Sequence, residues 1–178
     1  MNTIIYLKLD NENFNENSLD SFVRHQEVKE CWRNINGEWQ LMPIEFLENW
    51  NGEQLRAKAA VITEKIKGEW YGYGAFVEDK VVGYITVSYD KFGSKNQYSE
   101  LVLFHVSEPY RNMGIGKNLF RLACNEAKKN CIERLYISAH SSKESQAAYR
   151  KLGCTFAEEI NHRLAEEEPC DIQMEFVV

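Results

Sequence analysis

The stretch that most constrains this chain is a strong strand pattern that runs into a glycine-containing turn and then into a helix pattern. Residues 98–106 are rich in aromatic and β-branched side chains, and residues 114–129 place apolar side chains at helical spacing. Gly114 and Gly116 lie at the junction. Glycine lets the backbone approach a ligand, and the unpaired N–H groups at a helix start carry partial positive charge. The junction therefore predicts a cradle for an anion such as a phosphate.

Two common nucleotide-binding motifs do not fit this junction. A Rossmann fingerprint needs a third glycine where the chain has Leu119. A P-loop needs glycine at Arg111, and Ser or Thr at Asn118 after Gly116-Lys117. The remaining pattern, R-x-x-G-x-G, is weak alone and is also typical of a helix start that binds nothing.

The rest of the chain shows alternating strand and helix patterns. Strands are expected over residues 3–9, 70–77, 81–88, 135–138 and 170–178, and helices over 18–28, 43–67 (one or two), 114–129 and from Ser141 to just before Gly153. Ser141 and Glu144 form a capping-box pattern, and Asn36-Gly37 is a hairpin-turn signal. The order of these segments predicts a mixed α/β class with one central sheet.

Composition excludes several classes of protein. The chain has 178 residues, a net charge of −6 and no apolar run of membrane-spanning length, which predicts no nucleic-acid or membrane partner. Its five cysteines contain no C-x-x-C pair and its four histidines lack metal-ligand spacing. No signal peptide is visible at the N-terminus. We therefore expect a reduced, cytoplasmic protein without a disulfide framework or a metal.

A second motif decides whether the glycine turn binds a phosphate or is a helix start that binds nothing. The helix pattern after residues 135–138 carries Tyr149-Arg150-Lys151-Leu152-Gly153. Together with Arg111-x-x-Gly114-x-Gly116 and the order of the strands, it resembles the GCN5-related N-acetyltransferase (GNAT) superfamily. The resemblance covers residues 70–156 well and the first 66 only in layout. It implies one domain, residues 1–178, with a variable acceptor-side region (1–68), an acetyl-CoA-binding core (69–158) and a C-terminal strand (159–178).

The resemblance also implies a fold and a cofactor site. The fold is α/β (α+β), a mixed central sheet of six to seven strands in which the parallel strands 98–106 and 135–138 splay apart. The pantetheine arm of acetyl-CoA would lie in the gap and the pyrophosphate on the amides of residues 111–117. The implied cofactor-binding residues are Val106, Arg111, Asn112, Met113, Gly114, Ile115, Gly116, Lys117, Ser142 and Tyr149. Two positions depart from the usual pattern: Ser142 replaces a frequent Asn and Ala148 a frequent Phe.

The implied reaction is N-acetylation by direct attack of an amine on the thioester, with no metal. Tyr149 resembles the family's general acid, and a backbone N–H near Val106 would stabilise the oxyanion. Glu100 is the first candidate base, because it lies eleven positions before Arg111, where histone-acetylating relatives place a catalytic glutamate. It is also expected to share strand parity with Val102, Phe104 and Val106. His105 and a water molecule are the alternatives.

The acceptor is the least defined part of the sequence reading. The expected acceptor is a primary amine of a small molecule or a peptide. Whether the protein forms a homodimer stays an open question at this point. Aromatic and acidic residues of the N-terminal third would suit a cationic acceptor: Trp32, Trp39, Trp50, Asp20, Glu45 and Glu48. Packing in the core explains the three tryptophans equally well. A non-catalytic module that binds or senses acyl-CoA on the same fold is the alternative function.

Overall fold

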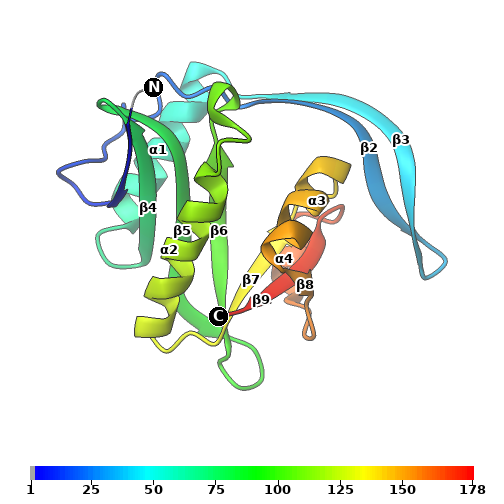
Figure 1. Cartoon of the computed structure of the whole chain (residues 1–178). Coiled ribbons are helices and arrows are strands. Elements are labelled where there is room, and N and C mark those ends of the chain that lie inside the picture. The colour runs from blue at the N-terminus through cyan, green and yellow to red at the C-terminus, as the bar shows by residue number, and fades with distance from the viewer. Residues whose placement is uncertain (1–2) are drawn as a thin grey trace.

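A seven-stranded sheet with helices on both faces organises the chain, and a separate two-stranded hairpin extends beside it (Figure 1). The computed structural model describes residues 3–178. The strands of the large sheet are β1 (Ile4–Lys8), β4 (Trp70–Val77), β5 (Lys80–Phe92), β6 (Tyr98–Val106), β7 (Arg134–Ala139), β8 (Thr155–Phe156) and β9 (Ile172–Val177). The hairpin consists of β2 (His25–Ile35) and β3 (Glu38–Asn49). The helices are α1 (Gly52–Lys65), α2 (Ile115–Lys129), α3 (Lys143–Leu152) and α4 (His162–Glu167), with a short 3₁₀ turn at Glu108–Tyr110.

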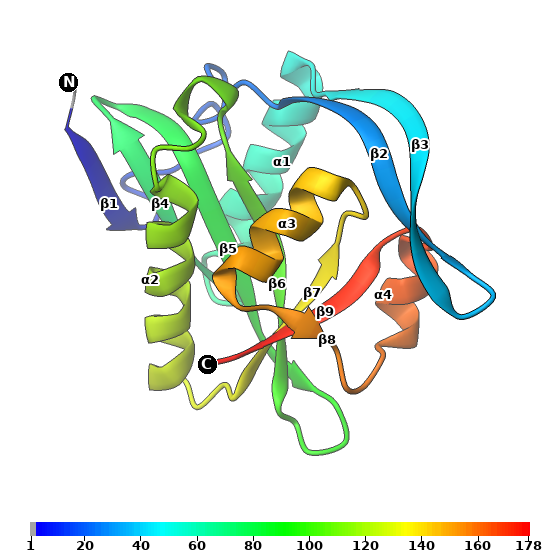
Figure 2. The same cartoon turned by 45° about the vertical axis from the view of Figure 1, so that its right-hand side comes forward.

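The order of the large sheet is β1-β4-β5-β6-β7-β9-β8, and β6–β7 is its parallel pair. The apolar stripe of α2, which includes Ile115, Leu119 and Ala123, packs with α3 side chains on one face. Buried side chains of α1 pack on the other face with Tyr84, and Leu164 of α4 packs there with Tyr136. Figure 2 shows α2 and α3 in front of the sheet and α1 behind it. The expected α+β fold is confirmed.

The parallel pair opens after three residues. Tyr98, Ser99 and Glu100 pair with residues 134–136, after which β6 continues to Val106 without a partner on that side. β7 instead pairs along its whole length with β9. Both strands keep running in the same direction, so their C-terminal ends form an open V, and the predicted splay is confirmed.

A bulge in β6 reverses the expected orientation of Glu100. Thr86 pairs with Leu103 while the next residue, Val87, pairs with Leu101, so Val102 is an extra residue on β6. Leu101 and Phe104 consequently lie on the same face, toward α2. Glu100 lies on the opposite face, toward α4. The expectation that Glu100 shares a face with Phe104 and Val106 is wrong, because one extra residue shifts the period-2 alternation.

The hairpin is the largest departure from the sequence-based expectation. Residues 18–21 form turns and residues 22–24 are irregular, where a helix was expected. Residues 25–35 pair with residues 38–49 through the predicted Asn36-Gly37 turn. The helix expected over 43–67 therefore begins only at Gly52, after Asn51 caps it with Gln54 in a capping box. Apolar side chains on β3 and α1 fall by chance on one helical spacing, and cross-strand pairing, which is not local, determines residues 38–49.

The hairpin also fixes the start of α3. The Trp32 amide donates to the Ser141 carbonyl at 2.8 Å, and Cys31 forms an isolated bridge with Ser142. Ser142, rather than Ser141, is the N-cap of α3, and its hydroxyl accepts from the Ser145 amide. The expected cap is thus wrong by one residue. The expected end of the helix is confirmed, because Gly153 takes the left-handed conformation (φ +97°) that closes a helix.

Candidate active site

The glycine turn before α2 has the features of an anion-binding helix start. Gly114 is the N-cap with φ +79°, a left-handed conformation that favours glycine, and no side chain caps the helix. The first intrahelical bond reaches back from the Asn118 amide to the Gly114 carbonyl, so the amides of residues 115–117 have no partner within the helix. The first turn carries no acidic side chain. These amides fit a phosphate group, and Lys117, which is exposed, adds positive charge.

Arg111, one of the implied cofactor-binding residues, bonds to the backbone of β6. Its Nε donates to the Val106 carbonyl at 3.2 Å, which ties the turn to the end of β6. Burial lowers the pKa of Arg111, and the positive charge of Arg24 lowers it further. The positive charge of Arg111 in turn lowers the pKa of His105. The side chain therefore lies between the turn and the sheet. Asn112 and Met113, in contrast, are exposed beside Gly114.

The side chain of Tyr149 reaches the gap between β6 and β7 from α3. Its ring is tilted against that of Phe104 on β6, with 6.3 Å between the centroids. Burial raises the pKa of Tyr149 well above its ordinary value. The nearby Cys154 and Asp171 raise this pKa further by smaller amounts. The hydroxyl keeps its proton at neutral pH and is in the correct state to donate it.

Ser142 is placed near the site, but its hydroxyl is already engaged. The residue is fully buried beneath the hairpin. Its Oγ accepts from Gln26 Nε2 at 3.2 Å and from the Ser145 amide at 3.2 Å. It also donates to Ser145 Oγ at 2.9 Å. Capping is therefore the role that the structure assigns to this hydroxyl, and its predicted contact with the cofactor stays a prediction.

Glu100 and His105, the two sequence candidates for the base, lie on the α1–α4 face of β6. Glu100 is the last residue of β6 that pairs with β7, so it lies at the vertex of the splay. Burial raises the pKa of Glu100, opposed in part by Arg163, whose Nη2 is 3.8 Å away. His105 packs edge-on against Trp50, and burial followed by the charges of Arg24, Lys58 and Arg111 lowers its pKa to about 3. His105 is consequently a neutral and weak base.

A chain of contacts joins the two open ends of the splay, and sequence reasoning missed two of its members. The Arg24 guanidinium lies 5.5 Å from the Trp50 ring centroid and donates to Glu48 Oε2 at 2.5 Å. Glu48 Oε1 lies 3.4 Å from Nε2 of His140, which directly follows β7. His140 Nδ1 accepts from the Ser142 amide, which places the imidazole proton on Nε2, facing Glu48. No local motif marks Arg24 or His140, because their neighbours come from distant parts of the chain.

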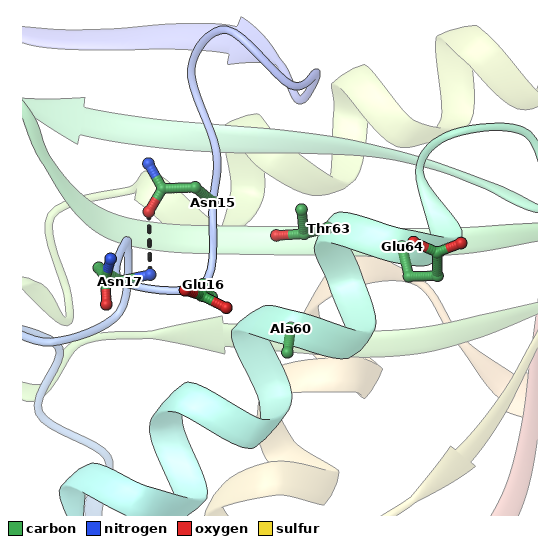
Figure 3. Close-up of a pocket in the computed structure, with 6 residues that line it drawn as sticks. All are labelled: Asn15, Glu16, Asn17, Ala60, Thr63 and Glu64. Atoms are coloured by element: carbon green, nitrogen blue, oxygen red, sulfur yellow. Dashed lines mark hydrogen bonds between the residues drawn. The ribbon is translucent and has the colours of Figure 1, made fainter.

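Other candidates for the acceptor site lie elsewhere. Asp20 pairs with Arg56 at 2.9 Å on the exposed side of α1, and Trp39 stacks on Phe156 at 5.9 Å. Two surface hollows also lie against α1. One of about 590 Å³ is lined by Asp20, Gly52, Glu53 and Arg56, and one of about 360 Å³ is lined by Asn15, Glu16, Asn17, Ala60, Thr63 and Glu64 (Figure 3). Neither contains a residue that the sequence assigned to the cofactor or to catalysis.

Two further observations concern residues 3–178. No three His, Cys, Asp or Glu side chains in this part of the chain are arranged to hold a metal ion. Within the same residues, no helix is both long and apolar enough to span a membrane.

The geometry suits an anionic, extended cofactor. The free strand edge of β6 from Leu101 to Val106 can pair with an extended chain, the amides of 115–117 can hold a pyrophosphate, and Tyr149 faces the gap between them. These are the features that acetyl-CoA requires, as the sequence resemblance implied.

Comparisons with known proteins agree with this geometry. The sequence profile described as the Acetyltransferase (GNAT) family matches residues 32–154. No curated protein matches the chain in sequence. Among solved structures, a nourseothricin acetyltransferase is similar with a TM-score of 0.71 at 13% identity, with 98% of each chain covered. A Bacillus anthracis protein assigned as a streptothricin acetyltransferase, in complex with acetyl coenzyme A, gives 0.70 at 16% identity, with 99% of each covered. The PaiA N-acetyltransferase of Thermoplasma acidophilum, in complex with coenzyme A, gives 0.61 at 18% identity, with 99% of each covered.

The structural neighbours share the fold, and the family profile covers more than half of the sequence, including the glycine turn and Tyr149. The chain belongs to the GNAT family of acetyltransferases.

Proposed function

We propose that this protein transfers the acetyl group of acetyl-CoA to a primary amine of a small molecule or peptide by direct attack on the thioester. The observation that carries the proposal is the opening of the β6–β7 ladder after Glu100, with Tyr149 across the gap. Acetyl-CoA supplies an activated acyl group with a thiolate leaving group. The chain supplies binding, orientation and proton transfer.

Cofactor binding would depend on local donors. The protein is net negative and coenzyme A is anionic, so the overall field opposes binding. The amides of residues 115–117 and the side chain of Lys117 would offset this at the pyrophosphate. The residues that would hold the cofactor are those predicted from the sequence, with Arg111 acting by fixing the turn to Val106.

The acceptor must lose a proton before it attacks. A lysine-like amine has a pKa near 10.4, and presenting it neutral at pH 7 costs about 4.6 kcal/mol at 1.36 kcal/mol per pKa unit. Glu100 is the proposed proton acceptor, because burial makes it a stronger base than an ordinary glutamate. His105, with a pKa of about 3, is a poorer candidate.

The later steps need an anion-stabilising group and an acid. Backbone N–H groups near Val106, on the unpaired edge of β6, would stabilise the oxyanion. Tyr149 would donate its hydroxyl proton to the departing thiolate and be protonated again from solvent. The protonated state of Tyr149, which burial maintains, supports this role.

We further propose a reduced, cytoplasmic setting. All five cysteines are free, and Cys31, Cys124 and Cys154 are buried as thiols. Burial raises the pKa of Cys154, so it is a poor nucleophile, and its backbone amide bonds to the Tyr149 carbonyl at the end of α3. These features support structural rather than catalytic roles for the buried thiols.

The proposal is tested with the wild-type protein, acetyl-CoA and a panel of amines. The panel contains streptothricin, an aminoglycoside, lysine, 1,4-diaminobutane and a lysine-containing peptide. Thiol release and the mass of the acetylated product are measured, and calorimetry measures coenzyme A binding. Turnover of at least one amine is expected. Tight binding of coenzyme A without turnover of any of them would favour the sensing module instead.

A further inference from the structure

Asp171 lies at the open end of the splay, where no sequence motif points to it. It directly precedes β9, and the pair Ala139–Ile172 is the last rung between β7 and β9. The Asp171 amide bonds to the Glu168 carbonyl at 2.9 Å, which fixes the backbone after α4. The side chain is half-buried and lies beside Ser138, near the C-terminal end of β7.

The Asp171 carboxylate lacks the cation that compensates its neighbours. Glu48 is paired with Arg24 at 2.5 Å, and Glu100 has Arg163 at 3.8 Å. For Asp171 the structure shows a 3.5 Å contact from Ser138 Oγ and, within residues 3–178, no cationic group within 4 Å. A half-buried carboxylate without such a partner is costly unless a ligand supplies one.

Charged groups from three other parts of the chain act on Asp171. Burial first and Glu168 second raise its pKa to about 6, Glu48 of β3 acts in the same direction, and Arg33 of β2 opposes them. Arg33 itself is held by Ser141 Oγ and by the Trp32 carbonyl, each at 2.7 Å. Asp171 is thus ionised at neutral pH and sits in a locally negative environment.

Asp171 also lies close enough to Tyr149 for its charge to raise the pKa of that hydroxyl. Tyr149 approaches the gap from α3, where it meets Phe104 of β6, and Asp171 approaches from the start of β9. An amine between them would contact the carboxylate and lie next to the proposed acid. The Asp171 carboxylate therefore lies at the C-terminal end of β7, beside Ser138 and within electrostatic range of Tyr149.

We propose that Asp171 binds the acceptor as a cation: its carboxylate pairs with the ammonium group of an aliphatic amine beside Tyr149. This inference rests on the proposed acetyl transfer and adds a substrate class to it. Aliphatic amines, which are protonated at neutral pH, are favoured over aromatic amines, which are neutral. Asp171 is a binding residue in this assignment, and Glu100 keeps the role of proton acceptor.

The test compares Asp171→Asn with a matched control, Asp79→Asn, in the exposed turn between β4 and β5. The best acceptor of the amine panel is used, and coenzyme A affinity is measured by calorimetry. D171N is expected to raise the acceptor KM at least tenfold, with kcat within about fivefold and coenzyme A affinity within twofold of wild type. D79N is expected to change none of these quantities.

A second measurement does not depend on a variant that folds. The acceptor KM of the wild-type protein is expected to rise as pH falls through about 6, because Asp171 is then protonated. In D171N this rise is expected to disappear. An unchanged acceptor KM in folded D171N, or a wild-type KM that is flat between pH 5 and 7.5, overturns the assignment while acetyl transfer itself stands. Absence of turnover with every amine of the panel overturns both.

Discussion

The Arg24 guanidinium donates a 2.5 Å hydrogen bond to the Glu48 carboxylate, and only 9% of the Arg24 side chain is exposed. The pair links the segment before β2 to the end of β3. Arg24 lies over the Trp50 ring, which packs against His105 at the end of β6. Glu48 lies next to His140, which follows β7, so the pair connects both strands of the splay. Arg24 Nε has no partner of its own, so this guanidinium already lacks one hydrogen bond. The Arg24–Glu48 pair is therefore a point where a single substitution disturbs both stability and the acceptor side.

Glu48→Ala is expected to lower the free energy of unfolding by about 3–5 kcal/mol, because it leaves a buried guanidinium without its carboxylate. Urea denaturation measures the change. Asp20→Ala is the matched control, since it breaks the exposed Asp20–Arg56 pair and is expected to change stability little. Equal losses in the two variants would show that the Arg24–Glu48 pair contributes no more than a surface ion pair.

Tyr149→Phe is expected to lower kcat by about 10²–10⁴-fold with coenzyme A affinity unchanged. The substitution keeps the ring against Phe104 and removes only the proton for the thiolate. Steady-state kinetics and calorimetry measure the two quantities together. Tyr89→Phe, on the ring that contacts Tyr71, is the control and should leave kcat unchanged. A kcat within about twofold of wild type would mean that another group protonates the thiolate.

Gly114→Val is expected to weaken coenzyme A binding more than tenfold, or more than 1.4 kcal/mol. The φ of +79° disfavours a branched residue, so the turn must change shape and its amides lose their alignment. Gly37→Val is a close control, because Gly37 also has a positive φ (+90°) and open space around its Cβ, but lies in the hairpin turn. Titration calorimetry should show a loss of affinity in G114V alone. Equal affinity in folded G114V and G37V would remove the cofactor site from this turn.

Glu100→Gln is expected to lower kcat by about 10²–10⁴-fold while the acceptor KM changes little, because it removes the proton acceptor and keeps the shape. Glu167→Gln on α4, which removes a neighbouring exposed carboxylate, serves as the control. Comparison with D171N separates the two carboxylates, since one should affect kcat and the other KM. Normal kcat in E100Q would assign proton removal to water or to another side chain.

His105→Phe is expected to make the protein less sensitive to acid. The pKa of His105 is about 3 in the folded state and about 6.5 when unfolded, so the unfolded chain binds more protons between these values. His105 therefore costs stability as pH falls from 6.5 toward 3. Phenylalanine keeps the contacts with Trp50 and Tyr84 without the proton. When pH is lowered from 7.5 to 4.5, the variant is expected to lose up to about 2.7 kcal/mol less free energy of unfolding than wild type, at 1.36 kcal/mol per pH unit below 6.5, as measured by urea denaturation.

The control for this pH experiment is His162→Phe, at the exposed start of α4. Parallel pH profiles for wild type and H105F would mean that the pKa of His105 in the folded protein is not lowered as described above.

Local patterns were sufficient for the cofactor half of the molecule. The strand over 98–106, the helix after Gly114 and the helix that ends at Gly153 each follow from periodicity and from the left-handed conformations that glycine allows. The place of Gly114 at the start of α2 follows from the same local patterns, whereas the position of Tyr149 relative to the sheet came from the family resemblance. The sheet of six to seven strands and its splay came from the family resemblance. The observed seven-stranded order confirms the first, and the opening of the β6–β7 ladder confirms the second.

The acceptor half depends on contacts between distant residues, and only the tertiary structure determines these. A helical spacing of apolar residues concealed β3, which exists because it pairs with β2. The extra residue Val102 turned Glu100 to the face opposite Phe104, and the β5–β6 register alone reveals it. Asp171 comes within electrostatic range of Tyr149 because β9 pairs with β7, which lies far earlier in the chain. The hydrophobic periodicity of a helix or strand and the capping of a helix depend on a few neighbouring residues, so they can be read from the sequence. The register between strands that are far apart in the sequence depends on burial summed over the whole core.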